Sequence, residues 1–540
     1  MSAIDPTRTA TAEQDAVIVG AGFAGLYMLH RLRERGLNVL VVEAGSDIGG
    51  TWFWNRYPGA RCDVESVDYS YSFSDELEQE WTWSERYATQ PEILSYIHYA
   101  ADKFGLREDI RVNTRVLAAD WDDASERWTV KTSAGDEYRA RYCIMATGNL
   151  SVPNLPTIAG LDEFTGEVYH TGDWPHESVD FRGKRVAVIG TGSSGTQLIP
   201  IVGQEAASLS VFVRTPNFSV PANNGPLDPE CVAEVKRNYR ARRELTRSTA
   251  TGLAQDMNRV SALAVSEEER REIYERNWQV SGFGFILSFN DLLSSPEANK
   301  TAADFLNSKA RELIDDPEIA RTLTATDYPF GSKRPCVDTD FFATFNRDNV
   351  SLVNVRKQPI QALTATGVAT TAAEYEFDMI VFATGFDAMT GALNRIEITG
   401  RDGVTLTERW AEGPSTYLGV GVAGFPNMFI ITGPGSPSVL SNVLVSIEQH
   451  VGFLDGLLAH ARDGEHSVIE VERAAEDEWS DHVQELAYRT LYPVSNSWYL
   501  GPPKSDRSRR VFMPYTGGLR AFRRKCNAVV EANYEGFALC

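Results

Sequence analysis

The sequence predicts an α/β fold built from two similar strand–loop–helix units, with a helical segment inserted into the second unit. Two observations predict the units: Gly20, Gly22 and Gly25 follow one apolar run, and the same glycine spacing recurs at residues 190–195. A third observation predicts the insertion, because charged segments of helical period fill residues 227–325. At 540 residues the chain is long enough for several buried cores.

The first unit begins with "DAVIVGAGFAGLYMLHRL", which indicates a buried strand, a glycine-rich turn and a helix. In such a turn Gly20 makes the bend, Gly22 lets the backbone approach a pyrophosphate, and Gly25 lets the helix pack closely on the strand. The next strand ends on Glu43, where an acid accepts hydrogen bonds from ribose hydroxyls. A glycine-rich turn of an unrelated fold is the alternative, but strand, helix and acid together favour a dinucleotide with a free ribose.

A glycine pair follows Glu43 in "EAGSDIGGTWFWNRYPGARCD". Gly49 and Gly50 let the backbone run close to a pyrophosphate-bearing cofactor. The further residues expected at the cofactor of the first unit are Gly50, Thr51, Trp52, Asp63 and Tyr69.

The second unit, "RVAVIGTGSSGTQLIP", is followed by the strand "LSVFVRTP". This strand puts Arg214 where the first unit has Glu43, and a guanidinium can bind a 2′-phosphate bidentately, whereas a carboxylate would repel it. A solvated charge at a strand end is the alternative interpretation of Arg214. One acidic and one basic unit predict FAD in the first and NADPH in the second, and a duplicated dehydrogenase is the alternative. The predicted NADPH-binding residues are Gly190, Gly192, Ser193, Gly195, Arg214 and Thr215.

Between the two units lies "FTGEVYHTGDWP", residues 164–175. Neither neighbour of His170 is a metal ligand or a nucleophile, so the run does not predict a catalytic histidine. A structural histidine in a turn is one interpretation. The residues that stand out in this run are Phe164, Gly166, His170, Trp174 and Pro175.

The order of these segments predicts a discontinuous domain organisation. The charge runs of the insertion are expected to form solvated helix faces. The predicted parts are residues 1–147 and 391–540 for the FAD-binding domain, 148–226 and 326–390 for the NADPH-binding domain, and 227–325 for the helical insertion.

Composition excludes several classes of protein. The formal net charge of −22 disfavours nucleic acid or an anionic membrane as a partner. The six cysteines are scattered without a Cys-x-x-Cys pair, so we expect no metal site and no disulfide framework, as in a reducing cytoplasm. The first fifteen residues lack the apolar core of a signal peptide, and no apolar run reaches the ~18 residues of a membrane span.

From about residue 15 to the end, the chain resembles type I Baeyer–Villiger monooxygenases. Residues 164–175 match the fingerprint of that family, and related flavin monooxygenases carry a run that ends differently. Further matches, nearest to the phenylacetone and steroid monooxygenase branch, are "GGTWFWNRYPGARCD", "PFGSKR", "FNRDNV", "GFDAMTGAL" and "GPGSPSVLSN". The chain departs from the family at "GPPKSDRSRR", residues 501–510, where a mobile loop closes in relatives.

The resemblance implies roles for individual residues. Arg334 matches the catalytic arginine, Asp63 matches the carboxylate that positions it, and Lys333 matches a residue that adds to the 2′-phosphate grip of Arg214. Trp498 matches a tryptophan that contacts the nicotinamide cofactor. His170 becomes a hydrogen-bonding clasp of the linker between the domains rather than an acid–base group. The segment expected to line the substrate side is Pro437, Ser438, Val439 and Leu440.

The resemblance also implies a reaction. NADPH reduces FAD, reduced FAD takes up O2 to give a C4a-peroxyflavin, and the peroxide attacks a ketone to give an ester or lactone. Bulky aromatic, cyclic or steroid-like ketones are the expected substrates, with sulfides as further acceptors, and the enzyme is expected to be a monomer or weak homo-oligomer. Three alternatives remain open: an N- or S-hydroxylating flavin monooxygenase, a disulfide reductase, and a non-catalytic NADPH-sensing protein.

Overall fold

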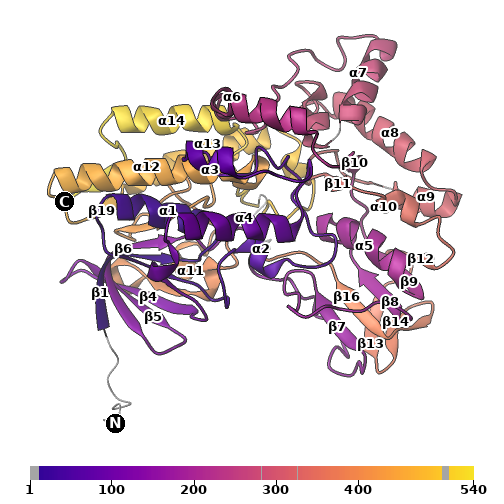
Figure 1. The fold of residues 1–540 in the computed structure, drawn as a ribbon, viewed down its shortest axis with the longest axis horizontal. Helices are drawn as coiled ribbons and strands as arrows, with labels where there is room; N and C mark the ends of the chain where they lie inside the picture. The colour runs from indigo at the N-terminus through magenta and orange to yellow at the C-terminus, as the bar shows by residue number, and fades with distance from the viewer. Residues whose placement is uncertain (1–10, 281, 325, 502–509) are drawn as a thin grey trace.

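The computed structural model describes residues 11–280, 282–324, 326–501 and 510–540. Figure 1 shows two α/β bodies side by side, the first with β1 and β6 and the second with β8 and β9. Each body contains a parallel strand–loop–helix unit at one of the two glycine-rich loops. The predicted α/β fold with two Rossmann-like units is therefore confirmed.

The sheet of the first body is mixed, in the order β17-β4-β5-β6-β1-β2-β3, with β18 also paired to β6. β1 runs parallel to β2 and β6, and β4, β5 and β6 form an antiparallel meander. The last two strands come from beyond residue 391, so the chain returns to complete this sheet. The strands are β1 Thr11–Val19, β2 Val39–Val42, β3 Ile110–Arg111, β4 Val116–Asp122, β5 Arg127–Thr132, β6 Glu137–Met145, β17 Glu397–Thr399 and β18 Met428–Ile430.

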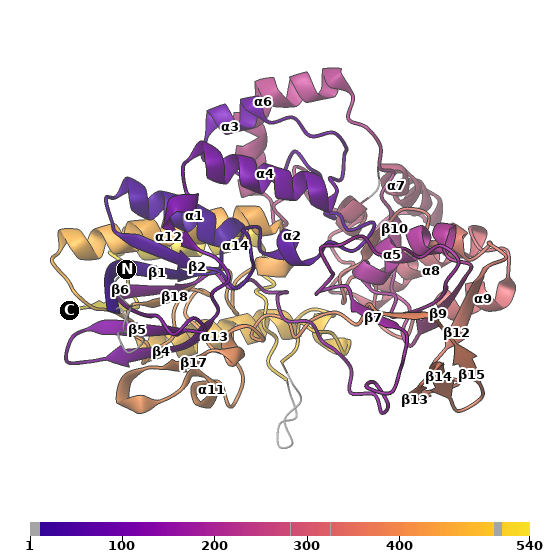
Figure 2. The same ribbon diagram turned by 60° about the horizontal axis from the view of Figure 1, so that its bottom comes forward.

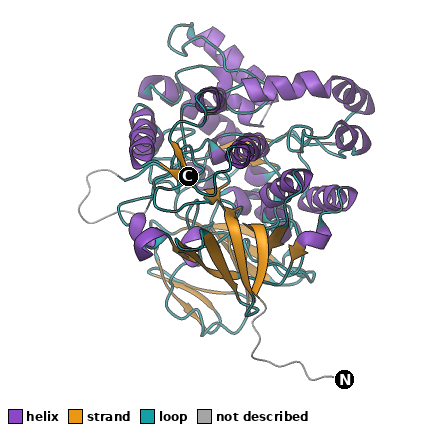
Figure 3. Ribbon diagram, turned by 90° about the vertical axis from the view of Figure 1, so that its left-hand side faces the viewer, coloured by secondary structure: helices purple, strands orange, loops and turns teal. Residues whose placement is uncertain are grey.

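Helices cover one side of this sheet, as Figure 3 shows. α1 packs on α12, and α12 on α14, around a core that includes Leu29, Val451 and Phe522. These helices shield one face of the parallel strands from water, and a second core that includes Val17, Met145 and Trp410 covers the other face. The other elements of the first body are α1 Phe23–Glu34, α2 Thr51–Trp54, α3 Asp75–Glu80, α4 Gln90–Lys103, α11 Leu406–Arg409, α12 Val443–Asp463, α13 Arg473–Tyr488, α14 Leu519–Glu531, β19 Ile469–Val471 and β20 Phe537–Leu539.

The second body has a parallel five-stranded sheet in the order β12-β9-β8-β16-β7. α5 packs against this sheet, and a small antiparallel sheet, β13-β14-β15, lies beside it. The elements are β7 Glu167–His170, β8 Arg185–Ile189, α5 Ser193–Glu205, β9 Ser208–Val213, β10 Ser219–Pro221, β11 Cys336–Asp338, α10 Phe341–Thr344, β12 Val350–Asn354, β13 Ile360–Thr364, β14 Gly367–Thr370, β15 Glu374–Glu376 and β16 Met379–Phe382. Short 3₁₀ turns are η1 Arg107–Asp109, η2 Gly282–Ser288, η3 Leu393–Arg395, η4 Arg401–Gly403, η5 Ser438–Leu440 and η6 Tyr492–Val494.

The inserted helices do not form one unit. They are α6 Pro229–Ser248, α7 Glu267–Val280, α8 Pro296–Glu312 and α9 Pro317–Leu323. α7 and α8 share a core with β10 and β11, on the side of the second body. α6 instead contacts α3 and α14 of the first body, and Figure 2 shows it beside α3 and α4, away from α7. The insertion is thus divided between the two bodies.

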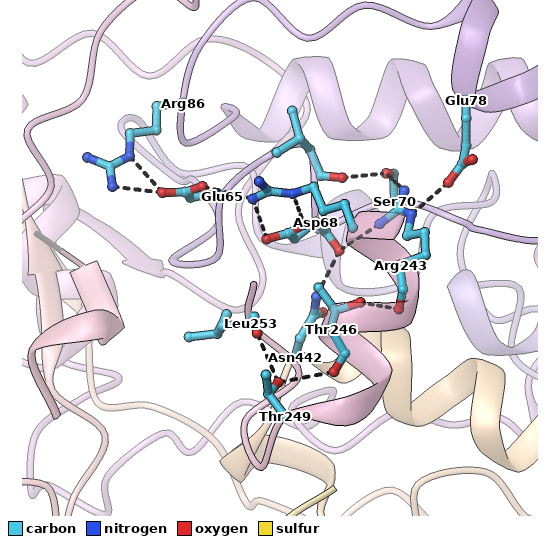
Figure 4. Close-up of polar contacts among 12 residues, drawn as sticks. Glu65, Asp68, Ser70, Glu78, Arg86, Arg243, Thr246, Thr249, Leu253 and Asn442 are labelled. Atoms are coloured by element: carbon cyan, nitrogen blue, oxygen red, sulfur yellow. Dashed lines mark hydrogen bonds and ion pairs between the residues drawn. The ribbon is translucent and has the colours of Figure 1, made fainter. Parts of the chain in front are cut away.

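Two arginines of α6 explain this division. Other charged residues of the helix, such as Glu234, Arg237 and Glu244, are exposed as expected. Arg243 is only 4% exposed. Its guanidinium donates to Glu78 of α3 at 2.6 Å and to Ser70 at 2.7 Å, as Figure 4 shows. The neighbouring Arg242 donates to both carboxylate oxygens of Asp68. Buried charges are stable only when they are paired, so these contacts dock α6 on the first body.

Candidate active site

A cavity of about 1420 Å³ lies where the two bodies meet. Both glycine-rich loops line it, and so do residues from the strand ends at 146–148 and 383–385. Of the residues expected to bind cofactors, all line the cavity except Gly25 and Gly195, which lie beneath the loops. In the part of the chain that the structure describes, no group of three or more His, Cys, Asp or Glu side chains could hold a metal ion, and no helix is long and apolar enough to cross a membrane.

The first loop has the shape of a pyrophosphate cradle. Gly20 has φ +106°, and a Cβ there would lie 2.6 Å from the carbonyl oxygen of Ala146. A Cβ on Gly50 would lie 2.8 Å from the Cα of Gly22, so the two glycine turns touch each other. The Glu43 carboxylate is buried and accepts hydrogen bonds from the backbone N–H groups of Ala21 and Gly45. The residues present therefore fit a dinucleotide that carries a free ribose.

The second loop repeats this geometry. Gly190 has φ +114°, and a Cβ there would lie 2.4 Å from the carbonyl oxygen of Ala383. A Cβ on Gly195 would lie 2.3 Å from the carbonyl oxygen of Gly190. Around Gly192, in contrast, no atom lies within 4 Å of such a Cβ, and the residue opens into the cavity. Ser193 begins α5, so backbone N–H groups at the helix start point toward this space.

Basic side chains gather at the far end of β9. Arg214 is exposed, Thr215 is half-buried, and both line the cavity. The ammonium of Lys333 lies 4.4 Å from the centre of the Tyr328 ring. Burial lowers the pKa of Lys333, and the nearby Arg214 lowers it further. The two cations predicted for the 2′-phosphate are therefore close enough to influence each other.

Arg334 lines the cavity between Asp63 and Val439. Its Nε and Nη2 donate to the two carboxylate oxygens of Asp63 at 2.7 and 2.8 Å, and its Nη1 donates to the carbonyl of Val439 at 2.6 Å. The ring of Phe283 covers the guanidinium at 4.1 Å. Burial by itself would lower the pKa of Arg334, but the charge and hydrogen bonds of Asp63 raise it above its ordinary value. The arginine is permanently charged and held in one orientation.

The three aromatic residues expected at the site, Trp52, Tyr69 and Trp498, all line the cavity. Trp52 donates from its indole nitrogen to the Tyr69 hydroxyl at 3.2 Å, and both rings are buried. The ring of Trp498 packs 4.5 Å from that of Tyr499. Residues 502–509 lie outside the described residues, so most of the altered loop at 501–510 is not part of this site description.

The expected substrate segment is only partly at the surface of the cavity. Val439 lines it, whereas Pro437, Ser438 and Leu440 do not. The 3₁₀ turn η5 accounts for this difference, because it turns successive side chains to different sides. Ser438 is fully buried, and Leu440 packs against the cluster around Tyr499.

The fingerprint residues lie outside the cavity and tie the crossings between the bodies together. His170 ends β7, and its Nδ1 accepts from the backbone N–H of Gly172, so Nε2 carries the proton toward Thr384 Oγ1 at 3.2 Å. The Thr384 hydroxyl in turn donates to the carbonyl of Asn154. Burial lowers the pKa of His170, so it is neutral.

The other fingerprint residues pack inside the second body. Phe164 and Trp174 are buried in two different cores. A Cβ on Gly166 would meet the Phe164 ring and the Asp378 carbonyl. Pro175 is half-buried just after Trp174.

Sequence reasoning did not single out several residues at the junction. Tyr57 is buried and donates its hydroxyl to Gln197 of α5 at 2.8 Å. The Gln197 amide also donates to the carbonyl of Arg61. These contacts join the segment before Asp63 to the second body. A glutamine on a helix and an aromatic residue in a loop carry no local signal of such a pairing, and the same holds for Phe283 above Arg334.

Comparison with known proteins agrees with this geometry. Residues 17–312 match the pyridine nucleotide-disulphide oxidoreductase family. The chain is 44% identical to a phenazine N-monooxygenase of Lysobacter antibioticus, over 97% of each chain. It is 40% identical to a Baeyer–Villiger monooxygenase of Pseudooceanicola batsensis, over 98% of this chain and 96% of the relative.

Solved structures extend the comparison to the whole fold and to the cofactors. An oxidized steroid monooxygenase bound to NADP is 52% identical, with a TM-score of 0.94, and the match covers 98% of this chain and 99% of that one. OTEMO in complex with FAD and NADP is 41% identical, with a TM-score of 0.95 over 98% and 100% of the two chains. The cofactors are thus FAD and NADPH, in agreement with the two loops. The chain belongs to the Baeyer–Villiger monooxygenases, the flavoenzymes that oxidise ketones with NADPH and O2.

Proposed function

We propose that Arg334, oriented by Asp63, is the residue on which ketone oxidation depends. The observation that carries the proposal is the two-pronged contact of Arg334 with Asp63 at the junction of the two nucleotide loops. A preorganised positive charge stabilises the oxyanion that forms when a ketone carbonyl is attacked. Bound FAD supplies the activation of O2, and NADPH supplies the electrons.

The other residues bind and orient the reactants. In this proposal Gly20, Gly22 and Glu43 hold FAD, and the second loop with Arg214 and Lys333 holds NADPH. Val439 and Trp498 exclude water on the substrate side. Three N–H groups of Arg334, one each on Nε, Nη1 and Nη2, already donate to Asp63 and Val439. The second N–H group of Nη1 and that of Nη2 are free for the substrate oxygen.

Bulky ketones are the substrate class that we infer. The 52% identity with a steroid monooxygenase supports aromatic, cyclic or steroid-like ketones, which would give esters or lactones. Six unpaired cysteines support action in the reducing cytoplasm. We propose a monomer or weak homo-oligomer, which size-exclusion chromatography would test.

The test is product identification. The purified protein is expected to be yellow, to consume NADPH faster when a ketone is added, and to yield one ester or lactone per NADPH. A panel of acetone, cyclohexanone, phenylacetone and progesterone separates small from bulky substrates. Ketone-independent NADPH consumption with no ester from any member of the panel would refute the proposal.

Oxygenation at nitrogen is a second candidate. It is favoured by the 44% identity with a phenazine N-monooxygenase. Because the aromatic ring nitrogen of a phenazine is itself the nucleophile, its oxygenation forms no carbonyl-derived oxyanion, and Arg334→Ala should spare N-oxide formation. Phenazine offered to the parent enzyme and to this variant distinguishes the two activities.

A further inference from the structure

We propose that Arg356, controlled by its ion pair with Asp327, is a further specificity-determining residue for the 2′-phosphate of NADPH. The proposal rests on the proposed assignment of Arg214, Thr215 and Lys333 to that phosphate. It adds a cation that lies 142 residues beyond Arg214 in the chain, together with an acid that opposes it.

The sheet brings Arg356 to the rim of this end of the cavity: Val355 and Thr215 line the cavity, and Arg356 lies next to them without lining it. β12 and β9 are parallel neighbours, with Asn354 opposite Val213. The pairing continues past both strands, because the backbone N–H of Val355 donates to the carbonyl of Val213 at 2.9 Å. Two residues beyond each strand, Arg356 therefore faces Thr215. Its Nη2 donates to the Thr215 hydroxyl oxygen at 3.0 Å.

Asp327 holds the other side of the guanidinium. Nη1 of Arg356 donates to one carboxylate oxygen at 3.0 Å, and Nη2 lies 3.3 Å from the other. Hydrogen bonding from Arg356 lowers the pKa of Asp327, so the acid is ionised at neutral pH. The next residue, Tyr328, lies under the Lys333 ammonium and donates its hydroxyl to the carbonyl of Pro216. One short segment thus positions both the acid and the lysine.

The charges at this end match a phosphate dianion. Arg214, Lys333 and Arg356 contribute three positive charges and Asp327 one negative charge, and a phosphate monoester carries nearly two negative charges at neutral pH. Arg214 has no ion-pair partner among the described residues. The Arg356 and Asp327 side chains are 44% and 62% exposed, and such pairs contribute little stability, so Arg356 can exchange part of its contact for a phosphate oxygen at small cost.

This arrangement predicts the order in which loss of Arg356, of Asp327 or of both changes phosphate binding. Without Arg356, the pocket loses a cation, and Asp327 loses its hydrogen-bonded partner, so that its negative charge weakens the attraction of the remaining cations for the phosphate. Without Asp327, the full charge of Arg356 becomes available. Loss of Arg356 should therefore be more harmful than loss of both residues together.

The experiment measures binding of two probes to the FAD-loaded enzyme by calorimetry. Adenosine 2′,5′-bisphosphate carries the 2′-phosphate and AMP lacks it. Arg356→Met should weaken bisphosphate binding about 10- to 100-fold, as expected for a charge-assisted contact, and leave AMP binding within about 2-fold. Asp327→Asn should tighten bisphosphate binding several-fold, and the double variant should bind it more tightly than Arg356→Met. The ratio of kcat/KM for NADPH to that for NADH should follow the same order.

Lys357→Met is the matched control, because this neighbouring cation pairs with Glu318 instead of facing the pocket. Unchanged bisphosphate affinity in Arg356→Met, or an equal loss for AMP, would overturn the inference, and so would a double variant weaker than Arg356→Met. Arg214→Met distinguishes a failure of the role proposed for Arg356 from a failure of the NADPH assignment. If it loses the preference for the bisphosphate and Arg356→Met does not, this inference alone fails. If the parent enzyme shows no preference, the assignment of the second loop fails.

Discussion

Neighbouring side chains fix the orientation of the Arg334 guanidinium. The two carboxylate contacts fix the plane of the guanidinium, and the Phe283 ring covers one face of it. Lysine offers a point charge on a flexible stem and cannot reproduce this fork. The orientation, and not the charge alone, distinguishes Arg334 from the other cations near the cavity.

Replacement of Arg334 should separate oxygenation from flavin reduction. Arg334→Ala is expected to retain FAD and to be reduced by NADPH, while ester formation falls about 10²–10³-fold or more, because one preorganised electrostatic contact is lost. Arg334→Lys should recover only part of the activity, and Asp63→Ala should show a milder form of the same defect. Ester yield per NADPH and the stopped-flow rate of flavin reduction are the two measurements. Ester formation at the parent rate in Arg334→Ala would show that the arginine is structural.

His170 should tolerate a substitution that preserves its hydrogen bonds. As a linker clasp it needs an acceptor for Gly172 and a donor for Thr384, and glutamine can supply one or both. His170→Gln should retain a substantial part of the turnover that His170→Ala loses. A group that transfers a proton would instead cost about 10²–10⁴-fold in both variants. Equal inactivity of the two variants in steady-state assays would argue against the clasp.

At the scale of elements, α6 is polar along its length yet belongs to a packed interface. Its arginines meet acids of the first body, and the turn after it supports Asn442, whose backbone N–H donates to the Thr251 carbonyl at 2.7 Å. The Asn442 side chain also donates to the carbonyl of Asp68, as Figure 4 shows. Since Asn442 caps α12 directly after the segment at 437–441, α6 supports one wall of the active site.

The buried pair in this interface should be costly to break from one side. Arg243→Met leaves Glu78 buried without a partner and should destabilise the protein by about 3–5 kcal/mol, whereas the double variant with Glu78→Leu should recover much of the loss. Burial already raises the pKa of Glu78, and loss of Arg243 should raise it further. The folded variant then binds a proton that the unfolded chain releases, so its deficit should shrink as pH falls from 7.5 to 5.5. Thermal unfolding at both pH values measures this, with exposed Arg240→Met as control. A double variant no more stable than Arg243→Met would contradict the pairing argument.

At the scale of the whole molecule, the two bodies are joined at the active site itself. The segment that leads to Asp63 packs on α5 through Tyr57 and Gln197. Gly59 in this segment has φ +83°, and a Cβ there would lie 2.4 Å from the carbonyl oxygen of Gln197. The distance between the bodies is therefore coupled to the position of the carboxylate that orients Arg334.

Gly59→Ala should disturb this junction beyond the backbone strain that it introduces. A non-glycine residue at positive φ costs roughly 1–2 kcal/mol, and at Gly59 the new methyl group would also collide with α5. We expect normal FAD content but more NADPH consumed per ester formed. Gly183→Ala is the matched control, because Gly183 has φ +74° and no atom lies within 4 Å of a Cβ there. Equal coupling of NADPH use to ester formation in both variants would show that the contact with α5 is unimportant.

The sequence by itself determined the two nucleotide-binding units, and it predicted opposite charge preferences for them. These features are local: a tight turn without room for Cβ atoms and one residue at the end of the next strand. Neighbours in sequence form them, so the pattern of glycines, Glu43 and Arg214 is readable without a fold. The boundaries of the predicted insertion, 227–325, likewise lie close to those of α6–α9.

Only the tertiary structure decided which distant side chains meet. Asp63 and Arg334 are 271 residues apart, and without the family resemblance no local pattern would pair them. The docking of α6, the buried positions of Pro437 and Ser438, and the approach of Arg356 to Thr215 have the same origin. Each depends on the register of strands and the packing of whole elements, because a charged or small side chain has the same local pattern whether it faces water, a core or a partner charge.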